Sequence, residues 1–396
     1  MDISLFERSP VGTLQPISGF DTYLDRPYQH FAFLPTPLPE VVPLSPLTIK
    51  LMGEAERAVG RLDAAASRLP NPSLLVRPAL LREAVSTSAL EGTYAPFHEV
   101  LEADFIDERK RSAEVREVRN YVQAAQRGLA LIEERPICLN LIAELQAIIV
   151  RGTRGDGFDA GQLRGGQVYI GERTRGIERS RFVPPPHGDL LAEGVSDWEK
   201  WLNADDHTPL LVKAALGHYQ FETLHPFSDG NGRLGRLIVT LQLVDAKAMR
   251  YPVLNLSPWF EPRKEEYKDL LLGVSLTGEY DDWLQFFFRA VTAQADDAVS
   301  RIDELMDVRA RFLDRLRSDG ARGVVLEIVE DLIGYPLITV SQAADLHNVT
   351  YPPAAKAVER LVQLGILREV TGRSYGRVFA CESVMRIVDR PTAAAD

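Results

Sequence analysis

The sequence predicts a mainly α-helical protein with a small β-hairpin near its middle and a compact mixed segment towards its end. Apolar residues recur at every third or fourth position over most of residues 47–151 and 188–317, which is the spacing of amphipathic helices. Between residues 152 and 186 the chain instead carries many glycines and three successive prolines, which interrupt helices. A length of 396 residues predicts two or three domains.

The charge and the cysteine content argue against several classes of protein. A formal net charge of −11 and a pI near 5.3 disfavour a protein that coats nucleic acid or an anionic membrane. Cys138 and Cys381 are far apart in apolar surroundings, so we expect reduced core residues and no disulfide. The first residues lack a basic segment followed by an apolar run, and no stretch is long and apolar enough to span a membrane. We therefore expect a cytoplasmic protein without membrane contact.

The N-terminal part combines a proline-rich arm with two helices. Residues 1 to about 45 carry many prolines and aromatic residues, and we expect an extended arm, because proline suppresses helices and ladder pairing. Helical spacing then covers residues 47–69 and again 74–90, where the second helix stops near Gly92. Further helices are expected at about 112–134, 138–151, 188–203, 208–224, 263–272 and 281–317.

The glycine-rich interval contains one short β-prone run, Gln167-Val168-Tyr169-Ile170. A short run of this kind, bounded by glycines and prolines, predicts a hairpin. A plain surface hairpin without a functional role is the alternative at this stage.

The most informative stretch runs from His225 to Arg236 and joins two helical segments. Gly230 and Gly232 flank Asn231 where the second helix begins, and free backbone N–H groups and the helix dipole attract an anion there. Glycine can adopt positive φ and lets a phosphate approach the backbone closely. The stretch therefore predicts a phosphate-binding loop.

Four side chains of this stretch supply groups for phosphoryl or nucleotidyl chemistry. Arg233 and Arg236 lie on one face of the new helix, and their planar guanidinium groups match phosphate oxygens. Asp229 offers the hard oxygen that Mg²⁺ prefers when it bridges phosphates. His225 is then available as the general base for a hydroxyl nucleophile. The alternative is a loop with surface salt bridges and a structural histidine, but so many defined residue types at fixed spacing rarely arise by chance.

These residues resemble the Fic family motif H-x-F-x-D/E-G-N-G-R-x-x-R, and every fixed position is filled. The resemblance implies a Fic-type helical core and the transfer of AMP from ATP to a Ser, Thr or Tyr hydroxyl of a protein, the chain itself included. Asp229 would hold Mg²⁺, with Mn²⁺ as the alternative metal. Arg236 would bind the γ-phosphate, Asn231 would add an amide donor, and Phe227 would anchor the loop.

A second pattern precedes the motif by about 145 residues, in the run Thr87-Ser88-Ala89-Leu90-Glu91-Gly92. Alone it is weak, since helices often end with a glutamate and a glycine. Beside a complete motif, Thr87, Glu91 and Gly92 resemble the inhibitory helix of the Fic family. The resemblance implies that Glu91 and the γ-phosphate compete for the same guanidinium of Arg236.

Two more segments resemble parts of the family. Gly161-Gln162-Leu163-Arg164 followed by the β-prone run 167–170 resembles the flap that docks the target backbone by strand addition. Tyr267 would line the base or ribose side of the nucleotide, with a core tyrosine as the alternative. The family usually has asparagine before the arginine equivalent to Arg263, and Pro262 at this position weakens the case for a nucleotide contact there.

The segment after Gly320 resembles a winged helix. Helices are expected at 324–333, 341–347 and 353–364, followed by a glycine-bearing hairpin to Ala380. The eight basic and nine acidic residues of this segment give it a net charge of −1, a weak footprint for DNA. Arg373 and Arg377 in the expected wing keep DNA contact open, beside protein docking or homodimerisation.

The sequence predicts three domains: an N-terminal region over 1–110 with the inhibitory helix, a catalytic core over 111–318 and a winged helix over 319–396. Four alternatives to AMP transfer remain at this stage. They are removal of AMP with Glu91 as the water-positioning base, phosphotransfer as in the Doc branch, transfer of another nucleotide or of phosphocholine, and a winged-helix regulator with a Fic sensor core. The Doc branch has lysine at the position of Gly232, which counts against phosphotransfer.

Overall fold

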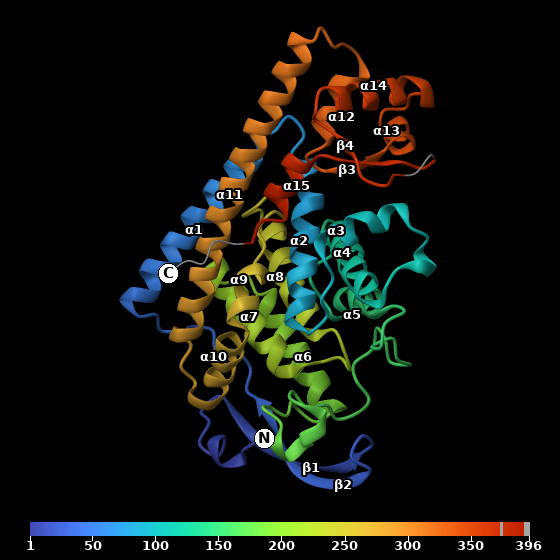
Figure 1. The fold of residues 1–396 in the computed structure, drawn as a ribbon. Coiled ribbons are helices and arrows are strands. Elements are labelled where there is room, and N and C mark those ends of the chain that lie inside the picture. Colours follow the sequence, from blue (N-terminus) through green and yellow to red (C-terminus); the bar gives the residue numbers. More distant parts are fainter. Residues whose placement is uncertain (373–374, 392–396) are drawn as a thin grey trace.

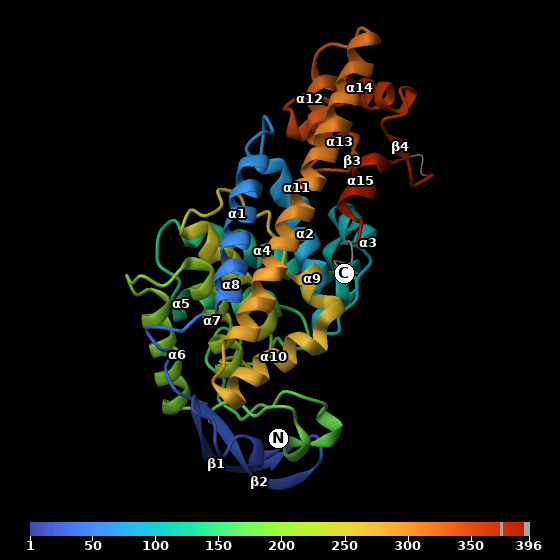
Figure 2. The ribbon, with the colours of Figure 1, turned by 90° about the vertical axis from the view of Figure 1, so that its left-hand side faces the viewer.

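The computed structural model describes residues 1–372 and 375–391 and has an elongated shape (Figures 1 and 2). A helical body lies in the middle, a β-hairpin lies at one end, and a small helix–strand module lies at the other. The helices of the body are α1 (Pro46–Ala66), α2 (Ser73–Leu90), α3 (Phe97–Glu102), α4 (Ala113–Leu131), α5 (Leu139–Val150), α6 (Asp189–Leu202), α7 (Leu210–Leu224), α8 (Asn231–Asp245), α9 (Ser257–Phe260), α10 (Lys264–Thr277) and α11 (Asp281–Ser318).

The sequence prediction of a mainly α-helical protein is confirmed, and the expected helices begin and end within a few residues of the observed ones. Side-chain caps explain two of the starts. Ser45 accepts a hydrogen bond from the backbone N–H of Thr48 before α1, and Ser112 accepts one from Val115 before α4. α2 ends at Leu90, and Gly92 follows with a φ of 88°, as the glycine signal predicted.

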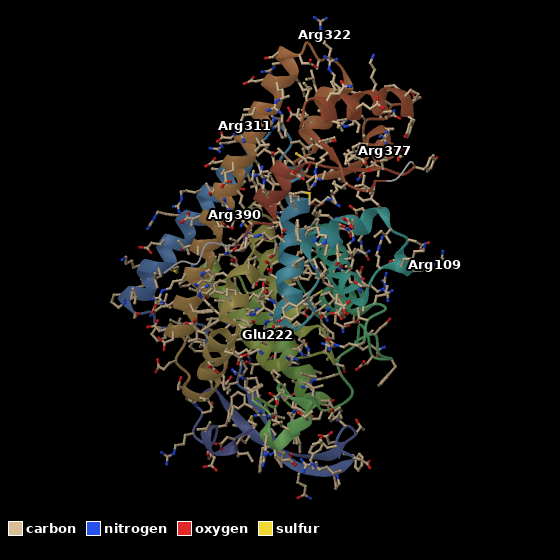
Figure 3. All side chains as sticks on the ribbon, viewed as in Figure 1. Arg109, Glu222, Arg311, Arg322, Arg377 and Arg390 are labelled. Carbon is tan, nitrogen blue, oxygen red and sulfur yellow. The ribbon has the colours of Figure 1, made fainter. Side chains whose placement is uncertain are left out.

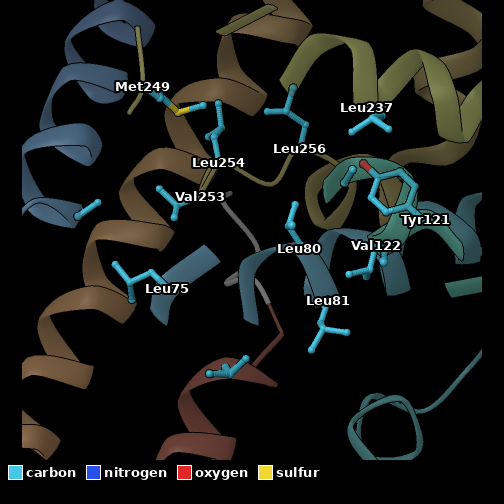
Figure 4. Close-up of a cluster of buried hydrophobic side chains, with 14 of the residues drawn as sticks. Leu75, Leu80, Leu81, Tyr121, Val122, Leu237, Met249, Val253, Leu254 and Leu256 are labelled. Atoms are coloured by element: carbon cyan, nitrogen blue, oxygen red, sulfur yellow. The ribbon is translucent and has the colours of Figure 1, made fainter. Parts of the chain in front are cut away.

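The core lies around α7 and α8, whose side chains are buried on nearly every face. α8 packs against α5, α4 and α2, while α7 packs against α6 and the long helix α11. A close-up of the buried side chains shows Leu80 and Leu81 of α2 near Tyr121 of α4 and Leu237 of α8 (Figure 4). This packing places the end of α2 beside the first turns of α8, so the two sequence patterns meet in one region.

The prediction of an unpaired N-terminal arm is wrong. Residues 12–35 form a long antiparallel hairpin of β1 (Gly12–Asp21) and β2 (Arg26–Pro35), paired from Gly12 with Pro35 to Asp21 with Arg26. A hairpin of two strands has a free edge on each strand, and prolines are tolerated where their missing N–H faces such an edge. The backbone N–H of Phe33 also donates to the carbonyl of Val183, 2.9 Å away, which ties the hairpin to the glycine-rich interval.

The expected hairpin around residues 167–170 is reduced to one antiparallel bridge between Ile170 and Phe182. Its backbone bonds include the one from the N–H of Ile170 to the carbonyl of Phe182, at 2.8 Å. Continuing this antiparallel register would bring Val168 opposite Pro184, the first of three successive prolines. Since proline has no N–H to donate, the ladder cannot continue in that direction.

The C-terminal module contains α12 (Val324–Asp331), β3 (Leu337–Thr339), α13 (Val340–Leu346), α14 (Tyr351–Gln363), β4 (Arg368–Glu369), β5 (Val378–Ala380) and α15 (Glu382–Val388). Its strands form an antiparallel sheet in the order β3-β5-β4. The sequence reasoning missed β3 and α15, which are too short to show a clear period. The winged-helix interpretation and the division into three domains stay predictions, and Arg373 lies outside the described residues. Within the described part of the chain, no helix has the length and apolarity that crossing a membrane requires.

Candidate active site

His225 lies at the turn between α7 and α8. It follows the last residue of α7 in the left-handed region, with φ 47° and ψ 60°, and this conformation reverses the chain towards α8. Its Nδ1 lies 3.3 Å from the carbonyl oxygen of Glu222, one turn earlier. Burial, together with the positive charge of Arg164, lowers the pKa of His225 to about 4. The imidazole is therefore neutral at neutral pH, as a proton acceptor must be.

Arg164 holds this turn from the side of the glycine-rich interval. Its side chain is fully buried, and its Nε donates to the carbonyl of His225 at 2.9 Å while Nη2 donates to that of Pro185 at 2.6 Å. The backbone N–H of Arg164 donates to the carbonyl of Pro226. Burial lowers the pKa of Arg164 to about 10, which leaves it charged. The sequence reasoning placed Arg164 in the flap but missed this role, which a charged residue beside glycines does not reveal.

The loop between the two helices is closed by Phe227 and Asn231. The Phe227 side chain is completely buried, as an anchor should be. The Asn231 side chain donates through Nδ2 to the carbonyl of Phe227 at 2.7 Å and accepts through Oδ1 from the N–H of Phe227 at 2.9 Å. In this arrangement the Asn231 amide hydrogen-bonds to the backbone of its own loop and not to a bound phosphate. Gly230 is the N-cap residue of α8, with a φ of 84°, and because glycine has no side chain it leaves the N-terminus of the helix without a side-chain cap.

Arg233 lies between two carboxylates. Its Nη1 donates to Oε2 of Glu117 at 3.0 Å, and its Nη2 donates to Oδ1 of Asp229 at 3.2 Å. The Oε2 of Glu117 also accepts from the hydroxyl of Thr93, which follows the inhibitory pattern. A chain of contacts therefore runs from the end of α2 through Glu117 and Arg233 to Asp229. Sequence reasoning missed Glu117, because a single glutamate on an amphipathic helix gives no signal.

The Glu117–Arg233 pair provides the first testable prediction. We expect Glu117→Ala to reduce the free energy of unfolding by about 3–5 kcal/mol, because it leaves a buried guanidinium without one of its two counter-charges. Chemical denaturation measures this change. The matched control is Glu114→Ala, an exposed glutamate one turn earlier on α4, which should change stability by less than about 0.5 kcal/mol. Equal effects of the two substitutions would show that the Arg233 contact is dispensable.

Asp229 fits a magnesium ion that is shared with a nucleotide. Its side chain is about one-third exposed, and its Oδ1 is held by Arg233, so the carboxylate has a fixed direction. Mg²⁺ in such sites uses one or two carboxylates and completes its shell with phosphate oxygens and water. Over residues 1–372 and 375–391 no cluster of three or more His, Cys, Asp or Glu residues could hold a metal. Asp229 alone would therefore hold such a metal only together with phosphate oxygens and water.

Arg236 is held by the end of α2. Its Nε donates to the Thr87 hydroxyl at 2.7 Å, and its Nη2 donates both to the Thr87 carbonyl at 3.1 Å and to Oε1 of Glu91 at 2.7 Å. The Arg236 side chain is 3% exposed, whereas that of Glu91 is 38% exposed. Burial alone would raise the pKa of Glu91, but Arg236 and Arg233 together hold it below its usual range. Glu91 is therefore an anion on the guanidinium that the motif assigns to a phosphate.

Gly232 leaves the space that Glu91 occupies. A Cβ added at this residue would lie 2.2 Å from Oε1 of Glu91 and 3.1 Å from Nη1 of Arg236. Since no carbon can approach an oxygen that closely, any larger residue would push the carboxylate aside. The glycine of the phosphate loop is thus also a requirement for the Glu91–Arg236 contact.

This steric relation predicts coupling between positions 91 and 232. We expect Gly232→Ala to displace the flexible Glu91 side chain and to lower the free energy of unfolding by about 1–3 kcal/mol, because Arg236 loses a charged partner. The same substitution in a Glu91→Gly background should have a much smaller effect, since the overlapping carboxylate is gone. A double-mutant cycle measures the coupling, and a coupling energy of zero would contradict the steric relation.

One pocket collects these groups. A cavity of about 120 Å³ is lined at its polar end by Glu91, His225 and Arg236, and its apolar wall includes Phe182 and Leu271. Ile170, Glu222 and Tyr267 also line this pocket. The combination of an apolar wall and a charged end suits a ligand with one apolar ring and one anionic group.

The remaining predicted residues lie in different places. Tyr267 lines the pocket but is also core, because it stacks on Phe260 and its hydroxyl lies 2.7 Å from Nε2 of His218. This contact makes His218 a buried structural residue. Of the flap residues, Ile170 lines the pocket, while the Gln167 side chain donates to the carbonyl of Pro184. Val168 and Tyr169 are half-buried next to Ile170, and the guanidinium group of Arg263 lies over the ring of Trp259.

The fold and the site define an α-helical protein in which a loop at a helix N-terminus, a neutral histidine and a buried arginine share one pocket. Comparison with family models gives the class a name. Residues 49–130 match the Fic/DOC family N-terminal model, and residues 136–243 match the Fic/DOC family model. The first match contains Glu91, and the second contains the stretch from His225 to Arg236. Over these two ranges the chain is therefore similar to the Fic/DOC family.

Individual relatives agree with this assignment. The protein adenylyltransferase Fic of Drosophila virilis is 35% identical over 119 residues, which are 30% of this chain and 22% of that protein. The Drosophila melanogaster protein of the same name is 34% identical over 119 residues, which are again 30% of this chain and 22% of that protein. The match thus spans less than a quarter of the length of these curated relatives.

Solved structures share the fold. A Fic family protein from Desulfovibrio desulfuricans covers 87% of this chain and 98% of its own, with 22% identity and a TM-score of 0.57. A fragment of Fic-1 from C. elegans covers 66% of this chain and 74% of its own, with 24% identity and a TM-score of 0.50. These likenesses support the helical Fic architecture that the sequence predicted.

Proposed function

We propose that this chain transfers AMP from ATP to a hydroxyl group of a protein and that Glu91 restrains the reaction by occupying Arg236. The Glu91–Arg236 contact of 2.7 Å, in the pocket that also contains His225, carries the proposal. Two features support the nucleotide: the phosphate-binding start of α8 and the apolar wall beside it. The names of the curated relatives support the same reaction.

The proposed reaction uses His225 as the general base. The free Nε2 of the neutral imidazole accepts the proton of the target hydroxyl, because Nδ1 faces the Glu222 carbonyl. The hydroxyl oxygen forms a bond to the α-phosphorus, the bond from this phosphorus to the bridging oxygen breaks, and pyrophosphate leaves. A divalent metal held by Asp229 would neutralise phosphate charge. Arg236, once released by Glu91, would bind the γ-phosphate and align the α-phosphorus for this attack.

The location of the label identifies the transferred group. The protein is incubated with Mg²⁺ and a cell lysate, together with ATP labelled either at the α-phosphate or at the γ-phosphate. We expect protein-bound label from α-labelled ATP alone, because the β- and γ-phosphates leave as pyrophosphate. Label from γ-labelled ATP would instead support phosphotransfer and would contradict the proposal.

Removal of AMP is a second candidate, and one observation favours it. The Glu91 carboxylate borders the same cavity as His225 and is 38% exposed, so it can hold a water molecule in the pocket. AMP-modified protein produced by a Glu91→Gly variant is the substrate for a test. Release of AMP by the wild type and not by Glu91→Gly would support this direction, whereas equal stability of the modification with both proteins would dismiss it.

A further inference from the structure

Glu222 is a buried carboxyl group in the pocket that the proposed reaction does not use. It lies on α7 one turn before His225, and it appears in the interior of the molecule between the hairpin and the C-terminal module (Figure 3). Its side chain is 13% exposed, and its Oε1 has no hydrogen-bond partner among the described residues. A buried carboxyl group without a partner is expensive, so a protein rarely keeps one without a use.

The surroundings of Glu222 fix the direction of its carboxyl group. Oε2 lies 3.9 Å from Nδ1 of His225, and the backbone carbonyl of Glu222 lies 3.3 Å from the same nitrogen. On the other side, a Cβ added to Gly235 would lie 2.7 Å from Oε1. Glycine at position 235 of α8 therefore leaves the space in which the carboxyl group sits beside the imidazole.

We propose that Glu222 is the carboxylate partner of His225 and stabilises the positive charge that the imidazole gains when it accepts the hydroxyl proton. The inference rests on the proposed function. The hydroxyl proton moves to Nε2 while the oxygen bonds to phosphorus, and the imidazolium then carries N–H groups on both nitrogens. Nδ1–H is directed to the backbone carbonyl of Glu222, and the carboxylate balances the charge through space. Glu222 acts through His225 and is a positioning residue.

The opposing charge matters because His225 is otherwise a weak base. Burial and the charge of Arg164 disfavour its protonated form, which is why its pKa is lowered to about 4. A carboxylate about 4 Å away in a partly dry pocket offsets this bias only while it is ionised. Burial raises the pKa of Glu222 to about 7, against the attraction of Arg236 and with a further push from Glu91. Glu222 is therefore charged above about pH 7 and loses its charge as the pH falls through this value.

The other charged or titratable groups near Glu222 and His225 come from several elements. They are Glu91 directly after α2, Arg164 and Arg181 from the glycine-rich interval, His218 from α7, Asp229 and Arg236 from the motif, and Tyr267 and Lys268 from α10. Burial lowers the pKa of Lys268 and raises the pKa of Tyr267. Arg164 and Arg236 stay positive near pH 7, because the pKa of Arg164 is about 10 and Glu91 raises that of Arg236. The pKa of Glu222, about 7, lies near neutrality.

The test compares the pH dependence of kcat in a Glu91→Gly background, which removes the brake. We expect kcat of Glu91→Gly to fall as the pH drops through the pKa of Glu222, which lies below about 7 in this background because Glu91 no longer raises it. Glu91→Gly/Glu222→Gln should have a kcat about 10- to 100-fold lower above pH 7. In the Glu222→Gln variant, the pH at which kcat decreases should shift down towards the pKa of His225. KM for ATP should change little. Glu222→Asp, which keeps the charge, should retain the fall near neutrality, and Glu266→Gln, an exposed change on α10, should leave both parameters intact.

Other outcomes separate the competing explanations. An unchanged kcat and pH profile in the glutamine variant would overturn the inference, and so would an effect on KM alone, which would make Glu222 a nucleotide ligand. Thermal unfolding and the affinity for a non-hydrolysable ATP analogue check that the variant is folded and binds nucleotide. If the glutamine variant fails to fold, the Glu222→Asp variant provides the test. A reduced kcat with the same pH profile would support the pairing of Glu222 with His225, and loss of the pH profile would contradict it. Absence of transfer by Glu91→Gly itself would instead contradict the proposed function.

Discussion

Glu91→Gly is expected to raise the initial rate of self-modification by ATP and Mg²⁺ about 10- to 100-fold. Arg236 is almost completely buried and gives its Nη2 to Glu91, so in the resting protein this donor cannot bind a phosphate. A hydrogen bond between charged groups contributes about 1.5–3 kcal/mol, and the release of this donor to the γ-phosphate gives the stated factor. Incorporation of label from α-labelled ATP into the purified protein measures the rate.

A variant that removes only the charge of Glu91 distinguishes loss of the ion pair from a change in the conformation of the helix end. Glycine at position 91 could also loosen the end of α2, which Thr87 holds against Arg236. Glu91→Gln keeps the size of the side chain and the helix propensity but removes the charge. We expect it to activate as well, though less than glycine. Wild-type rates in both variants would show that Glu91 does not restrain the enzyme.

His225→Ala is expected to reduce transfer at least about 100-fold in both the wild-type and the Glu91→Gly backgrounds. Loss of a general base lowers a rate by about 10²- to 10⁴-fold, and among the residues that the structure describes no other histidine lines the pocket. The neutral state of His225 follows from its burial, which lowers its pKa to about 4, so the base remains available through the neutral range. The same α-label assay measures the loss.

The backbone conformation of His225 determines which substitution is the better control. Alanine tolerates the observed φ of 47° poorly, whereas asparagine adopts this region more readily. His225→Asn should therefore fold like the wild type and still lack the base. Substantial transfer by the asparagine variant, with normal nucleotide binding, would mean that another group accepts the proton.

The sequence predicted the helices of this protein well and its strands poorly. The period of apolar residues identified α1, α2 and α11, because burial against one core dictates it. The prolines of residues 1–45 led to the wrong expectation of an unpaired arm, since a sequence does not reveal which edge of a strand stays free. The opposite error occurred at residues 167–170, where three prolines on the partner segment limit a β-prone run to one bridge.

The site was predictable where one short stretch contains the chemistry. The motif located His225 and Arg236, and the resemblance located Glu91, which the structure places 2.7 Å from Arg236. The contacts of two other glutamates were not predictable. Glu117 and Glu222 gain their importance from burial beside the motif, and neither residue type nor spacing distinguishes them from other helix glutamates.

The relative affinity for ATP and ADP tests most directly whether Glu91 occupies the place of the γ-phosphate. Calorimetric titration of the His225→Asn protein, which cannot turn ATP over, measures both affinities with Glu91 present and after Glu91→Gly. With Glu91 present, Arg236 is occupied and the two nucleotides should bind with similar affinity. After Glu91→Gly, ATP should bind about 10- to 100-fold more tightly than ADP, because Arg236 gains the γ-phosphate as a charged partner. If the ratio of the affinities for ATP and ADP did not change on removal of Glu91, this result would contradict the competition between Glu91 and the γ-phosphate for Arg236.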